Sequence, residues 1–509
     1  MLKRLAQKPT AQNASLAAPI GGWNARDAVA AMQPLDAVIM DNVWPTTSDV
    51  QLRLGYQEWA SGIPGQVNTL LAYASATSDK LFAASGTEIY DVTTQGAVGA
   101  PVVTSLASDK WQYVNVSTSG GNFLVAVNGV DDPLRYDGSS WATTSITASG
   151  ITQADFININ VFKSRVWLVQ KDSLNAWYLP TDAIAGTATK FPLSAIANRG
   201  GYLVAMATWT IDAGEGMDDY AVFITSQGEA IVYLGTDPSS ANTWQLKGVY
   251  QMGAPLGRRC WTKFGGDLLV ACLDGVNPMS QVLQSTRVSQ SIQLTDKIIG
   301  AMNSAAQAYQ GNFGWQIDYC AQDNRVMVNV PAAIGEQQQF AMNAITGSWC
   351  RFTGIAANCW AQFNSVSYFG ADGVVGKFWT GNSDNGEVIT GDVLQAFNTF
   401  GSPGQLKRWT MAQLFFQASG PPAISANVNV DYDTQIVGAN VTVSPISFGL
   451  WDDALWDQGV WGGGLATYRP YVGLIGLGKS AGMRLALASS QLEIHWQATN
   501  FVYETGGFL

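Results

Sequence analysis

The sequence is poor in charged residues. Asp, Glu, Lys and Arg make up 13% of its 509 residues, whereas an ordinary soluble domain contains roughly a quarter. Aromatic residues reach 11%. Because the cores of protein interfaces are depleted in Lys and Glu and enriched in aromatic side chains, this composition favours a protein that covers part of its surface with other subunits. A β-rich protein with Ser, Thr, Asn and Gln on its surface is the alternative interpretation.

Histidine and paired cysteines are scarce as well. The only histidine is His495, and the five cysteines show no C-x-x-C spacing. A zinc site needs several clustered His or Cys ligands, which one histidine and scattered cysteines do not supply. We therefore predict no catalytic, cofactor-binding or metal-binding residue, and a structural role for His495 on a strand. The cysteines are expected to be small buried residues in a reducing compartment.

The balance of charge is negative. A net charge of −11 argues against a dedicated nucleic-acid-binding protein, which needs a basic face to replace the counterions of phosphate. It suits a protein past which DNA slides without being held. No stretch has the about 18 uninterrupted apolar residues that span a bilayer, and no apolar segment follows Lys3, Arg4 and Lys8. We expect neither membrane insertion nor a secretory signal.

Short alternating or β-branched runs, each ended by Gly, Asn or Asp, dominate the first three quarters of the chain, which is typical of antiparallel strands. The runs fall into groups that recur about every forty residues, the pattern of a β-propeller with four strands per blade. The clearest group is Leu203–Trp209, Tyr220–Thr225, Glu229–Leu234 and Trp244–Val249. We predict an all-β fold with six or seven blades. Little helix is expected, at Ile298–Tyr309 and around Pro34–Met40.

Longer strands follow after about residue 380. They are predicted at Val388–Phe397, Arg408–Gln417, Ile424–Tyr432, Arg484–Ala488 and Gln491–Tyr503. Strands of this length favour a β-sandwich or barrel-like platform domain over further blades. The predicted organisation is an N-terminal arm and strand that pack on the platform (1–65), a β-propeller (66–380) and the C-terminal platform (381–509).

Four segments carry a resemblance to a known family. The longest is Gly21–Tyr56, with the pattern G-G-x-N-x-R-D, then M-x-P-x-D-A, then D-N-x-x-P and V-x-x-R-x-G. The others are Ala230–Cys260, Gly265–Leu283 and Arg484–Gly507. Together they resemble the tail hub, nozzle or packaged-DNA stabilisation proteins (head-to-tail connectors) of short-tailed bacteriophages and prophages.

The resemblance implies a structural virion protein of the viral tail, a tail tubular protein that acts as a conduit for DNA retention and ejection. It implies a homohexamer that lies below the portal and its head-completion adaptor and attaches tail fibres, spikes or a needle. Double-stranded DNA would pass through without sequence-specific contact. The chain would be assembled in the bacterial host cytoplasm and reside in the virion tail.

Two other function classes compete with this interpretation. A glycan-binding or receptor-binding β-propeller module is the alternative that the aromatic content fits. A hydrolase is the third hypothesis, because Gly235–Trp244 is similar to the Asp-box turn of sialidase-like propellers. Glycoside hydrolysis requires two carboxylates in one pocket, and the spacing of Asp218, Asp219, Glu229 and Asp237 pairs none of them. We predict that the chain is not an enzyme.

Trp451, Trp456 and Trp461 are the candidate interface residues, because tryptophan is frequent among interface hot spots and a Gly-rich loop presents it well. Burial in the second domain is the other possibility for these rings. Asp431 and Asp433 are expected to share one strand face, either solvated or, with acidic residues of the Trp451–Gly464 loop, on a cation. Arg258 and Arg259 are expected in exposed ion pairs, with phosphate contact as the alternative.

Overall fold

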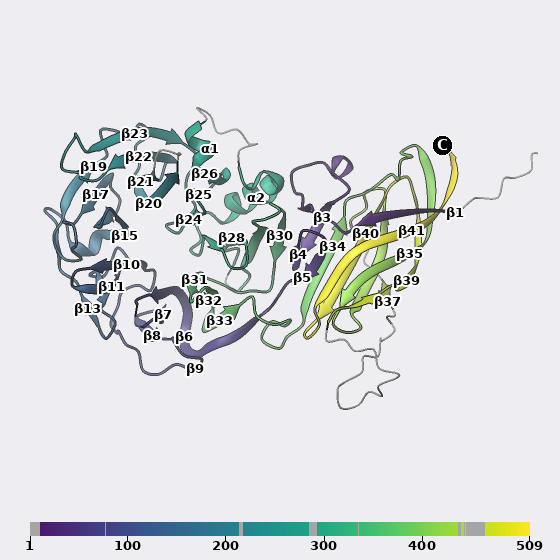
Figure 1. Cartoon of the computed structure of the whole chain (residues 1–509), viewed down its shortest axis with the longest axis horizontal. Helices are drawn as coiled ribbons and strands as arrows, with labels where there is room; N and C mark the ends of the chain where they lie inside the picture. Colours follow the sequence, from purple (N-terminus) through teal and green to yellow (C-terminus); the bar gives the residue numbers. More distant parts are fainter. Residues whose placement is uncertain are drawn as a thin grey trace, which may run out of the picture. The chain divides into compact units, whose positions relative to one another are not determined.

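The computed structural model describes residues 11–508 apart from 77, 213–216, 285–292, 334, 436–438, 442 and 444–463. Nearly all regular structure in this part of the chain is β-strand, which confirms the predicted class (Figure 1). The chain forms two compact units. Unit 1 comprises Met1–Gln57, Ala341–Thr353 and Trp379–Leu509, and unit 2 comprises Glu58–Phe340 and Gly354–Phe378.

Unit 2 consists of small antiparallel sheets that follow one another along the chain as propeller-like blades. Figure 1 shows them set radially in a ring. Sheet by sheet, the strands are β6 (Tyr56–Tyr73), β7 (Lys80–Ser85) and β8 (Glu88–Asp91); β10 (Gln112–Thr118), β11 (Gly121–Val127), β12 (Leu134–Tyr136) and β13 (Trp141–Thr143); β15 (Phe156–Phe162), β16 (Arg165–Gln170), β17 (Asn175–Tyr178) and β19 (Thr189–Pro192); β20 (Leu203–Asp212), β21 (Met217–Thr225), β22 (Glu229–Gly235) and β23 (Trp244–Gln251); β24 (Trp261–Phe264), β25 (Asp267–Cys272) and β26 (Gly275–Pro278); β27 (Gln316–Cys320) and β28 (Arg325–Val330), after which the chain enters β29 (Gln338–Asn343); and β31 (Cys359–Phe363), β32 (Val366–Gly370) and β33 (Asp372–Phe378).

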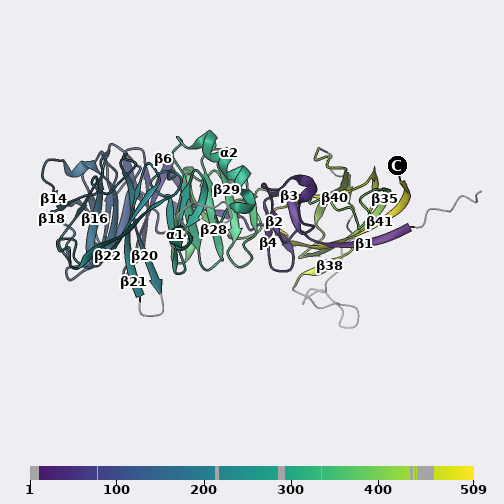
Figure 2. The ribbon, with the colours of Figure 1, turned by 90° about the horizontal axis from the view of Figure 1, so that it is seen from above.

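Short elements connect these sheets. They are β9 (Gly96–Ala97), β14 (Ile146–Thr147), β18 (Gly186–Thr187), the 3-10 turns η2 (Gln153–Asp155) and η4 (Asp296–Ile298), and the helices α1 (Met279–Gln284) and α2 (Ile299–Tyr309). The predicted helix at Ile298–Tyr309 is therefore confirmed. The four predicted strands of the clearest group are also confirmed as β20 to β23, and the β20–β21 hairpin projects beyond the neighbouring strands (Figure 2).

One long strand links the first sheet of unit 2 to its last. β6 is hydrogen-bonded to β7, with Val67 opposite Ser85, and also neighbours β33 in the same sheet. The Val67 amide donates to the carbonyl of Ala371 at 3.0 Å. Sharing one strand between the two sheets leaves neither with a free edge at this point.

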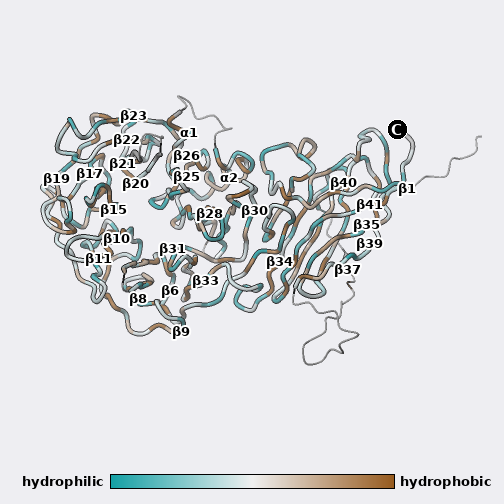
Figure 3. Tube along the Cα trace, viewed as in Figure 1, coloured by the Kyte–Doolittle hydropathy of each residue, from teal (hydrophilic) through white to brown (hydrophobic). Residues whose placement is uncertain are grey.

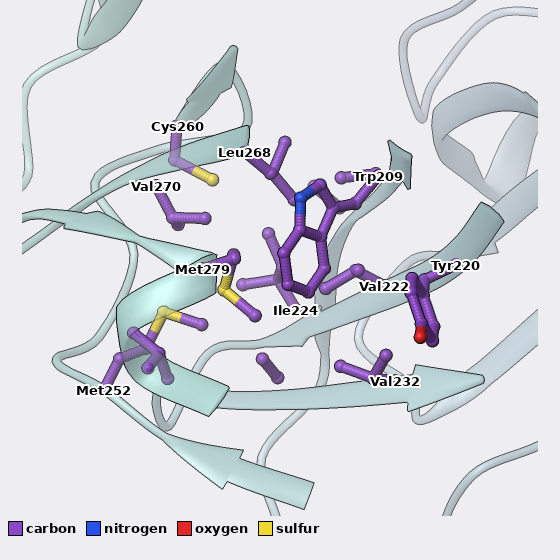
Figure 4. Packing of buried hydrophobic residues seen from close by; sticks show 14 of the residues in the cluster. Trp209, Tyr220, Val222, Ile224, Val232, Met252, Cys260, Leu268, Val270 and Met279 are labelled. Carbon is purple, nitrogen blue, oxygen red and sulfur yellow. The ribbon is translucent and has the colours of Figure 1, made fainter. Parts of the chain in front are cut away.

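Apolar side chains fill the space between neighbouring sheets. Between the β20–β23 and β24–β26 sheets, Trp209, Val222, Leu268 and Met279 are all buried and pack in one cluster (Figure 4). Large flat side chains suit this gap because facing sheets lie about 10 Å apart. The five cysteines are buried and unpaired, Cys260 within this cluster, as expected of small apolar side chains.

Polar side chains of the innermost strands join one sheet to the next. The Asn115 amide donates to the carbonyl of Ala72 at 2.9 Å, and Asn160 donates to the carbonyl of Met206 at 3.0 Å. Gln316 exchanges two hydrogen bonds with the backbone of Trp360. These amides satisfy backbone groups of the neighbouring sheet.

Unit 1 contains two larger sheets. One is built on β1 (Ala11–Ala17), β4 (Val43–Pro45), β5 (Val50–Leu52), β35 (Gln405–Ala418), β38 (Ala466–Tyr468), β39 (Tyr471–Gly478) and β41 (Ile494–Phe508). The other contains β2 (Gly22–Trp23), β3 (Asp36–Asp41), β30 (Trp349–Phe352), β34 (Ile389–Gln395), β36 (Ala423–Val430), β37 (Ala439–Val441) and β40 (Ala481–Ser489). The long strands predicted after residue 380 are confirmed, and Figure 3 shows hydropathy alternating along them.

The short helix predicted around Pro34–Met40 is wrong. A 3-10 turn, η1 (Val29–Ala31), comes earlier, and the segment itself forms β3, which pairs with β34 and, in parallel, with β2. Pro34 and the Asp36 side chain, which accepts a hydrogen bond from the Gln33 amide at 3.3 Å, belong to the turn before the strand. Pro34 and Asp36 are residue types that occur both in turns and at the start of a helix. Pairing of the segment with the distant strand β34 decides that it is extended.

Candidate functional site

The predicted interface residues Trp451, Trp456 and Trp461 lie outside the described residues. Three groups of described side chains are informative: the motif residues of Gly21–Tyr56, an exposed apolar surface on unit 1, and a set of pockets in unit 2.

Residues in the first half of the Gly21–Tyr56 motif form hydrogen bonds and an ion pair with one another within unit 1. The Asn24 amide donates to Asp36 Oδ2 at 2.8 Å and to Asp27 Oδ2 at 2.9 Å, and Arg26 pairs with Asp27 at 2.7 Å. Gly22 has φ +79°, and a Cβ at this position would lie 2.6 Å from the carbonyl oxygen of Trp349. The spacing of these residues thus reflects turn geometry and close backbone approach.

The second half of the motif centres on a buried arginine. Arg53 is 1% exposed and its guanidinium makes two hydrogen bonds to the carboxylate of Asp384, at 2.8 and 2.6 Å. Its Nε donates to Asn42 Oδ1 at 2.9 Å, which also accepts from the Thr353 amide at 2.9 Å. A fully hydrogen-bonded buried charge pair of this kind fixes a unique arrangement of the segments that it joins.

His495 lies on strand β41, as predicted, and its ring lies between two carboxylates. Its Nδ1 is 3.1 Å from Asp49 Oδ2 and its Nε2 is 2.8 Å from Glu493 Oε1. Burial favours the neutral ring, but the hydrogen bonds to the two carboxylates outweigh it and raise the pKa of His495. Burial likewise opposes ionisation of Asp49, yet the hydrogen bond from His495 holds the pKa of Asp49 below its usual value.

Two motif spacings occur in the sequence that the prediction of no catalytic residue overlooks. Gly473–Ser480, GLIGLGKS, has the spacing of a phosphate-cradling loop, and Gly478–Gly482 has the spacing G-x-S-x-G. Both mechanisms require a strand that turns into a helix. Here β39 continues to Gly478 and a tight turn leads to β40, with Ser480 2% exposed. The segment is a β-hairpin and forms neither site.

The carboxylates considered for glycoside hydrolysis have separate partners. Asp219 pairs with Lys163, Glu229 accepts from the amides of Asn198 and Arg199 at 3.0 and 3.1 Å, and Asp237 accepts from the Ser239 amide at 3.1 Å. In the turn that resembles an Asp box, Trp244 is buried and stacks on Trp167 with 5.4 Å between ring centroids. The geometry gives this turn a packing role.

Asp431 and Asp433 do not share a strand face, and this expectation is wrong. β36 ends at Val430, and Asp431 adopts φ +48° in the following turn. Its Oδ1 accepts hydrogen bonds from the amides of Lys479 and Ser480 at 2.7 and 3.0 Å. Long-range hydrogen bonds from the β39–β40 turn therefore occupy this carboxylate.

An exposed apolar surface covers part of unit 1. It consists of Met411 on β35 and Tyr471, Ile475 and Leu477 on β39, and is called the apolar face below. Ile475 is 95% exposed, Tyr471 63% and Leu477 61%. Within the described residues β39 pairs only with β35. An uncharged edge strand that presents large apolar side chains is a typical site of association with another chain.

Pockets open among the innermost strands of unit 2. A central pocket of about 320 Å³ is lined from several sheets, including Tyr113, Asn158 and Asp318. Burial raises the pKa of Asp318. An adjoining pocket of about 570 Å³, called the cationic pocket below, is lined by four cations and no carboxylate: Lys110, Lys171, Arg258 and Arg259. Both arginines also line the central pocket.

Arg258 and Arg259 do not form the exposed ion pairs that were expected. Arg258 Nη1 donates to the carbonyl of Asn128 at 3.2 Å. Arg259 donates to the carbonyls of Asn68 and Trp111 at 3.1 and 3.2 Å and to Thr69 Oγ1 at 2.7 Å. The adjacent arginines lie in the segment Ala230–Cys260, but no signal in the sequence linked them to Lys110 or Lys171, which only the fold brings near.

The described residues contain neither a metal-binding cluster nor a membrane-spanning helix. No group of three His, Cys, Asp or Glu side chains among them is arranged to hold a metal ion. None of their helices is both long and apolar enough to cross a membrane.

Comparison with known proteins leaves the family open. No protein-family model matches the sequence, and no curated protein matches it. Among solved structures, BBS1N in complex with ARL6DN, soaked with lead, is similar with a TM-score of 0.42 and 9% identity, over 65% of this chain and 99% of that one. YCF48 bound to D1 peptide has a TM-score of 0.37 and 10% identity, over 64% and 98%. At these scores neither likeness carries an argument about function.

Proposed function

We propose that this chain is a structural subunit of the tail hub, or nozzle, of a short-tailed bacteriophage, and that it acts without catalysis. It forms a homohexameric ring below the portal and its head-completion adaptor, binds tail fibres, spikes or a needle, and surrounds the path of double-stranded DNA. It resides in the virion tail after assembly in the host cytoplasm.

The apolar face is the observation that carries this proposal. A protein with so few charged residues that also exposes Tyr471, Ile475 and Leu477 on one edge strand needs a partner to remove this surface from water. Burying such side chains contributes about 25 cal/mol per Å² of apolar area. A second copy of the same chain supplies that partner in a ring.

The motif residues of Gly21–Tyr56 support the family assignment. Asn24, Asn42 and Arg53 are each committed to hydrogen bonds inside unit 1, so the motif marks a fold and not a catalytic site. A motif of structural residues is what a family of architectural proteins shares, because its function requires geometry alone.

The finer architecture belongs to the same proposal. Unit 2 is a seven-bladed propeller, with β6 shared between the first and last blades and with β27 to β29 as one blade. The two sheets of unit 1 form a sandwich-like platform whose outer strands, β39 among them, meet neighbouring subunits.

Cryo-electron microscopy of purified particles tests this proposal. The expected result is sixfold-averaged density below the portal into which both units fit separately as rigid bodies. Density at this place that accommodates neither the ring of sheets nor the platform contradicts it.

A glycan-binding or receptor-binding propeller is the second candidate. The pockets among the innermost strands of unit 2 favour it, because propeller ligands bind at the ring centre and because Phe313 and Trp315 line the cationic pocket. A glycan array separates the candidates: a specific hit favours a receptor-binding module, and the absence of any hit leaves the tail hub as the better explanation.

A further inference from the structure

We propose that the cationic pocket of unit 2 binds the oligophosphate group of a small ligand. The pocket has a volume of about 570 Å³ and is lined by Lys110, Lys171, Arg258 and Arg259. This function is separate from assembly, because it uses side chains of unit 2 and none of the apolar face.

None of the four cations is neutralised by a direct ion pair within the part of the chain that the structure describes. None of them is within ion-pair distance of a carboxylate among the residues that the structure describes. Asp172 attracts Arg258 and Asp109 attracts Arg259, but neither carboxylate forms an ion pair with its arginine. Asp109 instead accepts from the Asn68 amide and the Gly86 backbone at 2.9 and 2.6 Å. Asp131 accepts from the amides of Ala107 and Ser108.

This arrangement is unusual for an acidic protein. The chain has 38 Asp and Glu against 27 Lys and Arg, yet Arg258 and Arg259 direct their hydrogen bonds to backbone carbonyls and to a threonine hydroxyl. Burial lowers the pKa of Arg258 and of Arg259. Keeping adjacent guanidinium groups together in a partly desolvated pocket costs free energy unless an anion compensates them.

A backbone turn and a backbone hydrogen bond fix the position of Arg258 and Arg259 at the pocket wall. Gly257, with φ +73°, turns the chain before them, and the carbonyl of Arg259 accepts a hydrogen bond from the Ile317 amide at 3.1 Å. The Lys110 ammonium and the Arg259 guanidinium lie 4.6 and 5.3 Å from the ring centroid of Phe313. The aromatic ring holds these two cations in place without neutralising them.

Charge and volume together indicate the ligand class. Guanidinium groups bind phosphate in two-point geometry, and lysine binds it as a point charge. One carboxylate would leave several positive charges uncompensated, whereas a di- or triphosphate group matches them. A pocket of this size lies within the range of small-molecule sites, about 300 to 1,000 Å³, and is too small for a DNA duplex.

Isothermal titration of the purified full chain with sodium tripolyphosphate tests the proposal. We expect saturable binding that Arg258→Gln, Lys110→Gln and Lys171→Gln each weaken by about tenfold or more, since each variant loses a charge-assisted hydrogen bond to phosphate. Lys110 and Lys171 are exposed, so their substitution leaves folding intact even if Arg258→Gln does not. A parallel titration with adenosine triphosphate distinguishes the two possible sources of the oligophosphate group. Tighter binding of adenosine triphosphate than of tripolyphosphate indicates a nucleotide ligand, and equal affinity for the two compounds indicates an inorganic oligophosphate.

Lys190→Gln is the matched control, because Lys190 is an exposed lysine of unit 2 that does not line the pocket. Its affinity for tripolyphosphate should equal that of the unchanged protein. Absence of saturable binding, an equal loss in Lys190→Gln, or full binding by all three pocket variants overturns the proposal.

Discussion

Arg53 and Asp384 are joined by two hydrogen bonds of 2.8 and 2.6 Å, although 331 residues separate them in the sequence. Arg53 is the arginine of the motif V-x-x-R-x-G, and Asp384 lies after the last strand of unit 2 in chain order. One buried charge pair therefore joins the N-terminal segment of unit 1 to its C-terminal segment, at a point that precedes β34 in the chain.

Substitution of Arg53 should destabilise unit 1 strongly. Arg53→Ala leaves the Asp384 carboxylate partly buried without its partner, and breaking such a pair costs about 3–5 kcal/mol. Arg53→Lys keeps the charge but loses the two-point geometry, so its free energy of unfolding should lie between those of Arg53→Ala and the unchanged protein. Urea unfolding followed by tryptophan fluorescence measures the difference, and a loss below about 1 kcal/mol for Arg53→Ala would show that the pair is a weak surface interaction.

Gly55 should tolerate no side chain. A Cβ at Gly55 would lie 1.8 Å from the carbonyl oxygen of Ser383, so Gly55→Ala forces two backbone segments apart and should cost at least about 2 kcal/mol. Gly473→Ala is the control in the same unit, because a Cβ there meets no atom within 4 Å and its effect should be within about 0.5 kcal/mol. Equal thermal unfolding midpoints for the two variants would refute the close approach.

The sequence predicted the strands well and the tertiary contacts poorly. Alternating patterns located β20 to β23 and β34 to β36, because burial of one face imposes a period of two. The helix at Pro34–Met40 was wrong because pairing of β3 with β34 depends on residues more than 350 positions away, which no local pattern contains. The cationic pocket was missed for the same reason: Lys110 and Lys171 approach Arg258 only through the ring of sheets.

The stability of unit 1 should depend on pH through His495. Its pKa is raised above the ordinary value of 6.5 by Asp49 and Glu493 despite burial. The stabilisation is therefore fully present below about pH 6.5 and is lost as the pH rises through the higher folded-state pKa. The lowered pKa of Asp49 acts oppositely, and its contribution is lost only under acid conditions.

His495→Gln isolates this effect. The unchanged protein should lose stability relative to His495→Gln as the pH rises above about 6.5, in urea unfolding experiments at each pH. Parallel curves for the two proteins across this range would mean that the histidine does not gain charge stabilisation on folding.

The apolar face should mediate association. Ile475→Glu with Leu477→Glu places two charges on the exposed side of β39 and should weaken self-association by about tenfold or more, while urea stability stays unchanged because both side chains are exposed. Ile345→Glu is the control, since Ile345 is 66% exposed in the same unit but lies off this face. Sedimentation velocity over a range of concentrations measures the effect. Identical sedimentation of the double variant and the unchanged protein would exclude this surface as an interface.

The tail-hub proposal is tested most directly by counting copies. Quantitative mass spectrometry of purified particles, with labelled peptides of this chain and of the portal protein, gives their ratio. A ratio of one copy of this chain to two of the portal protein is the expected result for a sixfold ring below the portal. Absence of the chain from particles would contradict the proposal.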